Sequence, residues 1–124
     1  MINGGYAANT LALNGFTLTK TGSNTLFLNT TTVTAGTVNI AGGTVSQSNF
    51  AGPSASNASA ANFTLANTAG ATLALGNFPL TIASISGGGA TGGGVSLGGN
   101  TLTVGNASST TYAGVISGTG GVTK

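Results

Sequence analysis

The chain has 124 residues, of which 23 are glycine, and its only charged side chains are Lys20 and Lys124. It contains no Asp, Glu, Arg, His or Cys. Metal sites need carboxylate, imidazole or thiolate ligands, and general acid–base catalysis needs His, Asp or Glu in nearly every case. The composition therefore predicts a protein that is not an enzyme and that holds no metal and no cofactor.

The formal charge of +2 comes from two lysines at distant positions, so it forms no basic patch that could bind nucleic acid. No segment has the roughly 18 consecutive apolar residues of a membrane-spanning helix, and we expect no membrane insertion. The N-terminus lacks a secretory signal, so we expect either export arranged elsewhere or a piece of a longer polypeptide with an added start Met1. A nearly uncharged surface also favours self-association.

Along the chain, short runs of alternating apolar and polar residues are separated by turns rich in Gly and Asn. The first strand–turn–strand pattern covers residues 10–19 around Asn14–Gly15, and it returns at 37–46, 72–82 and 95–104. Alternation with a period of two is typical of strands, whereas Gly, Thr, Ser and Asn disfavour helix.

The four copies begin at residues 10, 37, 72 and 95, a spacing typical of repeat architectures. Two-residue Asn-Gly turns could instead close antiparallel hairpins and give a β-sandwich. A solenoid accounts better for the recurrence, because each unit would form one corner of a coil and stack its aliphatic side chains on the next coil. We therefore predict an all-β fold, a parallel β-helix (β-solenoid) of about five coils with Gly/Asn-rich turns.

We expect a single solenoid domain over residues 1–124, with loops that leave the coil near 51–61 and 87–94. Apolar residues in the strand pattern should face inward and form the core: Leu11, Leu13, Phe16, Leu18, Leu26, Leu28, Val38, Ile40, Val45, Leu73, Leu75, Phe78, Leu80, Ile82, Leu97, Leu102, Val104 and Ile116. The residues between strands should form the turns: Asn14, Gly15, Gly42, Gly43, Gly76, Asn77, Gly98, Gly99 and Asn100.

Three patterns resemble catalytic motifs but lack the residues that would make them work. Gly94–Gly98 fits the GxSxG nucleophile elbow, yet the chain has no His and no acid to complete a triad. Gly87–Gly92 fits the GxGxxG dinucleotide fingerprint, yet no acidic residue could hold a ribose. Lys20 and Ser23 could pair as base and nucleophile, but nothing in the sequence would desolvate the lysine, so we expect it to lie in water at a coil corner.

Threonine pairs of the form Thr-x-Thr occur at 17/19, 19/21, 32/34 and 101/103. Because alternate residues point to one face of a strand, such pairs could form a flat hydroxyl array that binds ice or a polysaccharide. Threonine is also a good strand former that faces water on the outside of a solenoid. The pairs are irregularly spaced and share no single coil position, so we expect the second role.

The segment Leu18–Leu28, followed by Ala35-Gly36-Thr37, resembles the autotransporter-associated β-strand repeat. The run from Thr110 to Lys124 is similar to another segment of the same family. Asn24 replaces a glycine that is usual in this repeat, and a segment usually found between Leu28 and Thr32 is missing. The resemblance implies a right-handed parallel β-helix in a secreted or surface-attached bacterial protein, with a structural and secretion-assisting role.

Together these observations predict a non-enzymatic structural β-solenoid outside the cell or at the bacterial surface. Its partners would be copies of itself, stacked head to tail into a filament or stalk, because an uncapped solenoid end is an exposed sheet edge. In the alternative, the chain is a segment of an autotransporter passenger or adhesin that displays a functional tip, and flanking coils cover its ends. A third alternative is an ice- or glycan-binding face rich in threonine.

Overall fold

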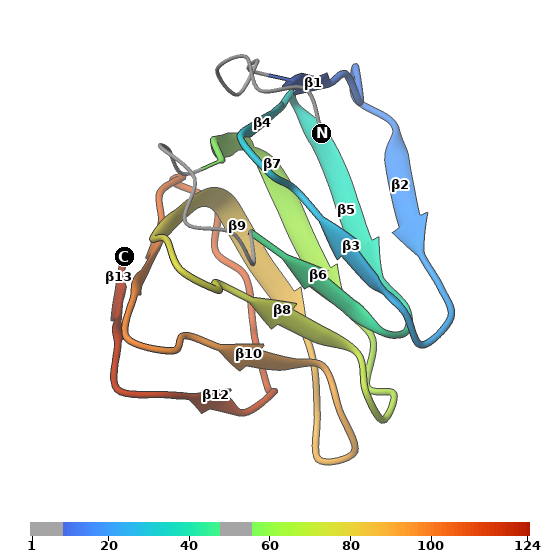
Figure 1. Ribbon diagram of the computed structural model, residues 1–124, viewed down its shortest axis with the longest axis vertical. Helices are drawn as coiled ribbons and strands as arrows, with labels where there is room; N and C mark the ends of the chain where they lie inside the picture. The colour runs from blue at the N-terminus through green and yellow to red at the C-terminus, as the bar shows by residue number, and fades with distance from the viewer. Residues whose placement is uncertain (1–8, 48–55) are drawn as a thin grey trace, which may run out of the picture.

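The computed structural model describes residues 9–47 and 56–124, which form thirteen β-strands and no helix. The strands wind into a stack of coils, which Figure 1 shows running from β1 at one end to β13 at the other. Their bounds are β1 Asn9–Leu11, β2 Thr17–Lys20, β3 Thr25–Phe27, β4 Thr31–Val33, β5 Gly36–Ile40, β6 Thr44–Ser46, β7 Ala58–Leu65, β8 Thr72–Ala74, β9 Leu80–Gly87, β10 Gly94–Ser96, β11 Thr101–Val104, β12 Ile116–Ser117 and β13 Gly121–Thr123.

All strand pairs among the described residues are parallel, which confirms the β-solenoid and excludes the antiparallel sandwich. Paired positions on neighbouring coils lie between 19 residues apart, at Thr25 and Thr44, and 28 residues apart, at Val45 and Leu73. One sheet contributes one strand per coil and has five strands, so the chain forms about five coils, as predicted. The right-handed winding stays a prediction.

The pairings give each coil three faces. The front face is the sheet β12-β10-β8-β6-β3, whose strands lie in this order across Figure 1. The back face contains β2, β5 and the second halves of β7 and β9, and it ends with a bridge between Gly87 and Tyr112. The side face contains β1, β4, the bridge partner Asn57, the first halves of β7 and β9, β11 and β13. The two long strands bend from the side to the back face, where the register of β7 and β9 shifts after Ala58.

Inward side chains stack in columns because strands paired in register turn the same positions towards the axis. In the back face, Phe63 lies between Val38 and Ile85 and is fully buried. Each fully buried aliphatic or aromatic side chain stabilises the fold by about 1.5–3 kcal/mol, so these columns supply most of the driving force for folding. The front-face column consists of Leu26, Val45, Leu73, Val95 and Ile116.

Most residues expected in the core are buried in the structure: Leu13, Leu28, Val38, Ile40, Val45, Leu73, Leu75, Leu80, Ile82, Leu97, Leu102 and Val104. Leu11, Leu18 and Leu26 are only half-buried because they belong to the first coil, and Phe78 is half-buried in the turn before β9.

Two of the core predictions are wrong. Phe16 is 77% exposed, because Asn14 and Gly15 take positive φ values of 51° and 87° and the turn directs Phe16 outward, while Leu13 occupies the buried place. Ile116 is 41% exposed, because it lies in the last coil and only Val95 covers it from the preceding one.

The predicted turn residues lie between strands, but only some of them need a left-handed backbone. Positive φ occurs at Asn14, Gly15, Gly43, Gly76 and Gly98, whereas the neighbouring residues Gly42, Asn77, Gly99 and Asn100 have ordinary φ values. At Gly43 φ is 67°, and a Cβ atom there would collide with the carbonyl oxygens of Gly22 and Asn24 on the preceding coil. This position therefore requires glycine for two reasons.

The expected loop near 51–61 is wrong at its C-terminal end, because β7 begins at Ala58 and continues in register with β5 and β9. Residues 51–55 lie outside the described residues. Within the expected loop near 87–94, residues 88–93 connect β9 to β10. Asn67 on the preceding coil accepts hydrogen bonds there from the N–H groups of Thr91 and Gly92, at 2.8 and 3.1 Å.

Candidate functional surfaces at the two ends and on the side face

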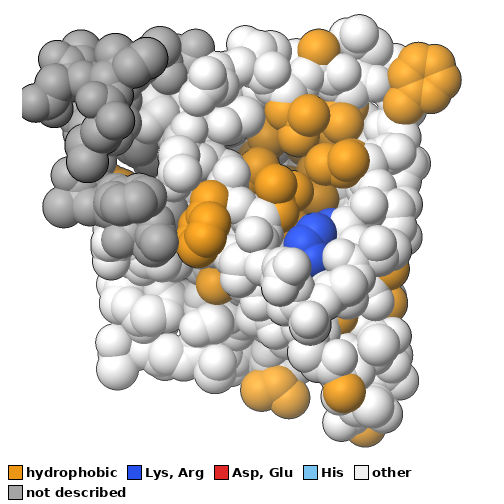
Figure 2. Space-filling model, turned by 45° about the vertical axis from the view of Figure 1, so that its right-hand side comes forward, with side chains coloured by type: hydrophobic (Ala, Val, Ile, Leu, Met, Phe, Trp, Pro, Cys, Tyr) orange, Lys and Arg blue, Asp and Glu red, His pale blue; other side chains and the backbone are white. Residues whose placement is uncertain are grey.

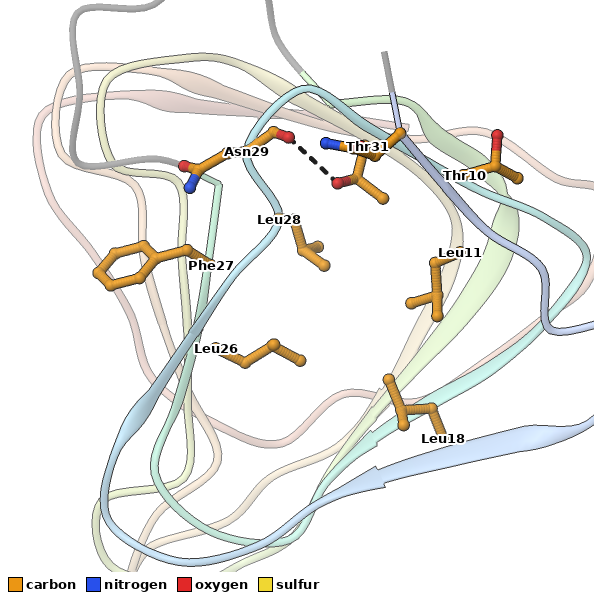
Figure 3. A pocket seen from close by; sticks show the side chains of 9 residues that line it. Thr10, Leu11, Leu18, Leu26, Phe27, Leu28, Asn29 and Thr31 are labelled. Carbon is orange, nitrogen blue, oxygen red and sulfur yellow. Dashed lines mark hydrogen bonds between the residues drawn. The ribbon is translucent and has the colours of Figure 1, made fainter. Parts of the chain in front are cut away.

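The N-terminal end of the solenoid leaves the core open. A cavity of about 480 Å³ lies at this end. Figure 2 shows apolar side chains gathered in a hollow there, with a lysine at its margin. Leu11, Leu18, Leu26 and Leu28 point into this space, whereas Phe27 points away from it (Figure 3). The edges of β1, β2 and β3 that face this end pair with no strand among the described residues.

Lys20 occupies an inward position in the same coil. It pairs in register with Ile40, but its ammonium group turns to the coil corner and donates hydrogen bonds to the carbonyl oxygens of Thr21, Gly22 and Gly42, at 2.7, 3.0 and 3.2 Å. The sequence predicts that Lys20 lies at a coil corner. It does not predict that Lys20 links two coils there through its bond to Gly42. Among the described residues, Lys20 makes no hydrogen bond to Ser23.

The C-terminal end is open as well. A cavity of about 260 Å³ there has Ile85, Val104, Tyr112, Ile116 and Val122 among its lining residues. Val122 is 49% exposed although it pairs in register with the fully buried Leu102. The Tyr112 hydroxyl donates a hydrogen bond of 2.6 Å to the carbonyl oxygen of Gly93, and burial raises the pKa of the phenol. Both ends thus present apolar side chains beside open strand edges.

A column of threonines runs along the outside of the side face. Thr10 pairs with Thr32, which pairs with Asn57, and Thr81 pairs with Thr103, which pairs with Thr123. Because Ala58 pairs with Ile82, Asn57 lies beside Thr81, and the six side chains form one continuous column. We call Thr10, Thr32, Asn57, Thr81, Thr103 and Thr123 the side-face column. Of the threonines in the Thr-x-Thr pairs, only Thr32 and Thr103 belong to this column, while Thr17 and Thr19 lie on the back face.

The hydroxyls of the five threonines in this column make no hydrogen bond to another described residue. On the back face the polar side chains instead pair between coils. The Ser84 hydroxyl donates to Asn62 at 2.6 Å, and the hydroxyls of Thr64 and Ser86 lie 3.2 Å apart. The hydroxyls of β7 and β9 on the back face thus form bonds between coils, whereas those of the five threonines in the side-face column do not bond to another described residue.

The residues of the catalytic look-alikes are structural. Ser96 of the GxSxG pattern is exposed on the outside of β10, and the glycines of the GxGxxG pattern form the turn that Asn67 supports. In residues 9–47 and 56–124, no cluster of His, Cys, Asp or Glu could hold a metal ion. The same residues form no helix that is long and apolar enough to cross a membrane.

Part of the chain is similar to a characterised protein. It is 51% identical over 49 residues to "Adhesin BmaC autotransporter" of Brucella suis biovar 1 (strain 1330). Part of the chain is similar to a bacterial autotransporter adhesin. The match covers 38% of this chain and 1% of the length of the adhesin.

No protein-family profile matches the chain. No solved structure matches it either. The similarity to an autotransporter protein, together with the β-solenoid fold, supports the coarser part of the resemblance noted in the sequence. Membership of the autotransporter-associated β-strand repeat family itself stays a prediction.

Proposed function

We propose that this chain is a structural, non-enzymatic segment of an extracellular or bacterial surface stalk, of the kind that an autotransporter adhesin would use to hold a functional tip away from the cell. The observation that carries the proposal is the open stack of coils, in which each end offers strand edges and apolar side chains to a further coil. The similarity to an autotransporter adhesin supports the surface location.

Two sources could supply the further coil. Copies of the chain could stack head to tail into a filament, since parallel strands give every copy the same polarity and the two ends differ. Flanking coils of a longer passenger could make the same contacts within one polypeptide. The match to only 1% of a much longer adhesin favours flanking coils. The nearly uncharged surface favours stacking of copies, because little charge repulsion would keep them apart.

Negative-stain electron microscopy and sedimentation velocity of the purified chain test this proposal. The informative variant is Val122→Asp, which puts a charge on the C-terminal end where an apolar side chain pairs with Leu102. The control is Thr123→Asp, which puts the same charge on the neighbouring residue that faces outward. An apolar-surface dye such as ANS reports whether the ends are exposed.

Thin filaments of uniform width, lost in Val122→Asp and kept in Thr123→Asp, would support stacking of copies. Separate particles or clumps that bind ANS, with less dye bound by Val122→Asp, would support flanking coils as the partner. A stable monomer that binds no ANS, and whose sedimentation neither variant changes, would contradict the proposal because its ends would not be docking surfaces.

The side-face column favours a second candidate function, binding of a neutral and periodic partner such as ice or a glycan. It presents one outward side chain per coil, spaced by about 4.8 Å, and five of the six are threonines. Their hydroxyls are not committed to other described residues, and no charged side chain belongs to the column.

A further inference from the structure

The side face of the solenoid contains a hollow of about 400 Å³. Five residues line it, namely Ser56, Asn57, Ser59, Pro79 and Thr81. Asn57 and Thr81 are neighbours in the side-face column, so the hollow lies within that column, between the coils of β7 and β9. Its volume is within the range of small-ligand pockets, about 300–1,000 Å³.

A register shift between β7 and β9 accompanies the hollow. From Ala58 to Asn62 the chain advances by four residues in β7, whereas from Ile82 to Ser84 it advances by only two in β9. Ser59 lies in the longer stretch, where it is exposed and lines the hollow. Irregularities of this kind redirect side chains and are frequent beside binding sites. The otherwise regular side face thus has an irregular place, and the hollow lies there.

The two coils that form the hollow are joined in the interior by Gln47. Its side-chain nitrogen donates to the carbonyl oxygen of Pro79 at 2.7 Å, and its side-chain oxygen accepts from the N–H of Ser56 at 2.9 Å. The Ser56 hydroxyl donates to the carbonyl oxygen of Leu28 and accepts from the N–H of Thr31 at 3.1 Å. Both Gln47 and Ser56 are buried. The backbone on both sides of the hollow is therefore held before a ligand arrives, which lowers the ordering cost of binding.

The exposed side chains of the hollow offer hydrogen-bonding groups without charge. The Asn57 side-chain oxygen accepts a hydrogen bond of 3.1 Å from the N–H of Ser59, which fixes the orientation of the amide. The Nδ2 group of Asn57 and the hydroxyl of Thr81 bond to no other described residue. Pro79 is exposed and adds an apolar ring. Neither of the two charged side chains of the chain lines the hollow.

We propose that this hollow binds one sugar ring of a neutral glycan. The inference rests on the glycan-binding candidate function of the side-face column, and it names the ligand class and the site. A pyranose has hydroxyls around its edge, which donate and accept hydrogen bonds, and C–H bonds on its faces, which pack against apolar rings. The Asn57 amide and the Thr81 hydroxyl suit the edge of the sugar, and Pro79 suits a face.

The same features disfavour the other ligands of such a surface. An ice surface needs a flat and unbroken array of side chains, and the hollow interrupts the column between Asn57 and Thr81. An anionic polysaccharide needs cations, and no charged side chain lines the hollow. A neutral sugar needs only the uncharged donors and acceptors that the hollow provides.

Titration of the isotope-labelled 124-residue chain with neutral oligosaccharides, followed by NMR, tests the proposal. The probes are maltotriose, cellotriose, mannotriose, chitotriose and lactose, each up to millimolar concentration. At least one should shift the backbone signals of Asn57 and Thr81 and the side-chain amide signal of Asn57. Thr81→Val removes the hydroxyl and keeps the shape of the side chain, and Asn57→Asp removes the Nδ2 donor and keeps the oxygen that Ser59 bonds. Each variant should weaken binding about tenfold.

The matched control is Thr103→Val, which makes the same change on the next coil of the side-face column, outside the hollow. It should leave the affinity unchanged. Equal weakening in Thr103→Val would mean that the ligand lies along the whole column, and binding that all three variants keep would mean that it lies elsewhere. Either result would overturn the site and leave glycan binding intact.

No shift with any of these sugars would overturn the proposal. Inhibition of ice recrystallisation by the same sample would then assign the side-face column to ice. The stalk function does not depend on this result, because dye binding and sedimentation test it separately.

Discussion

The side-chain amide of Gln47 donates a hydrogen bond of 2.7 Å to the carbonyl oxygen of Pro79 on the following coil. Gln47 is only 1% exposed. The backbone hydrogen bonds between neighbouring coils place it in one inward column with Leu28, Leu75 and Leu97. Its Oε1 atom accepts a hydrogen bond of 2.9 Å from the N–H of Ser56. A buried amide thus replaces an aliphatic side chain and joins the two ends of the segment between Gln47 and Ser56.

Both amide atoms of Gln47 are used, so the substitution Gln47→Glu should make stability depend on pH. A protonated Glu can still donate to Pro79 and accept from Ser56, whereas a buried carboxylate cannot donate and is poorly solvated. Burial therefore raises the folded-state pKa of the new carboxyl above its unfolded value of about 4.3. The variant should approach wild-type stability below about pH 4 and lose up to about 1.4 kcal/mol per pH unit as the pH rises through the folded-state pKa.

Urea unfolding at several pH values, followed by circular dichroism, checks this prediction. Thr37→Glu is the control, because Thr37 faces outward on the back face and its carboxylate stays in water. A Gln47→Glu variant as insensitive to pH as this control would show that the Gln47 site is open to solvent.

Phe63 and Phe16 provide a matched pair that tests the core. Phe63 is 0% exposed and Phe16 is 77% exposed. Phe63→Ala should reduce the free energy of unfolding by about 3–5 kcal/mol, because it opens a cavity in the back-face column. Phe16→Ala should change it by less than about 0.5 kcal/mol. Denaturant titrations of both variants measure the difference, and equal losses would mean that the exposed ring packs as well as the buried one.

Tyr112 should make the protein less stable in alkali. Burial raises its pKa above the ordinary value of 10.0, so the folded state holds the phenol proton more tightly than the unfolded state does. This contribution is fully present below about pH 10 and is lost as the pH rises through the folded-state pKa. Tyr112→Phe should lose about 1 kcal/mol at neutral pH, because the hydrogen bond to Gly93 disappears, and should fall less steeply above pH 10. Parallel pH-dependent melts of the two proteins would disprove the assignment.

The side-face column makes a separate prediction about binding. If it contacts ice or a glycan, the double variant Thr81→Lys/Thr103→Lys should lose that binding, because two long charged side chains would hold a flat partner off the face. Thr37→Lys, on the back face, should keep it. Ice recrystallisation inhibition and binding to neutral polysaccharides are the measurements. Absence of both activities in the wild type would leave the column with a structural role alone.

The fold could be predicted from the sequence because its signals are local. Alternation of period two and turns such as Asn14–Gly15 and Gly42–Gly43 are written in neighbouring residues, and they define strands and corners without knowledge of the rest of the chain. The two errors in the core, Phe16 and Ile116, arose where a turn or a chain end changes the direction or the cover of a side chain.

The candidate surfaces could not be predicted in the same way. The side-face column joins residues separated by 22, 25, 24, 22 and 20 positions, so no fixed period in the sequence reveals it. Gln47 was missed because a lone glutamine beside a strand gives no sign of burial until Pro79 and Ser56 are brought to it.

By itself, then, the sequence determined that this protein is an all-β solenoid with an aliphatic interior and almost no charge, since composition and short-range alternation restrict each residue's own environment. Only the tertiary structure decided which residues share a column and which strand edges stay open among the described residues. These properties depend on register, and register depends on coil lengths that vary from 19 to 28 residues as loops and turns change. Stacking between coils selects that register, because one inward position per strand must meet an apolar neighbour above and below.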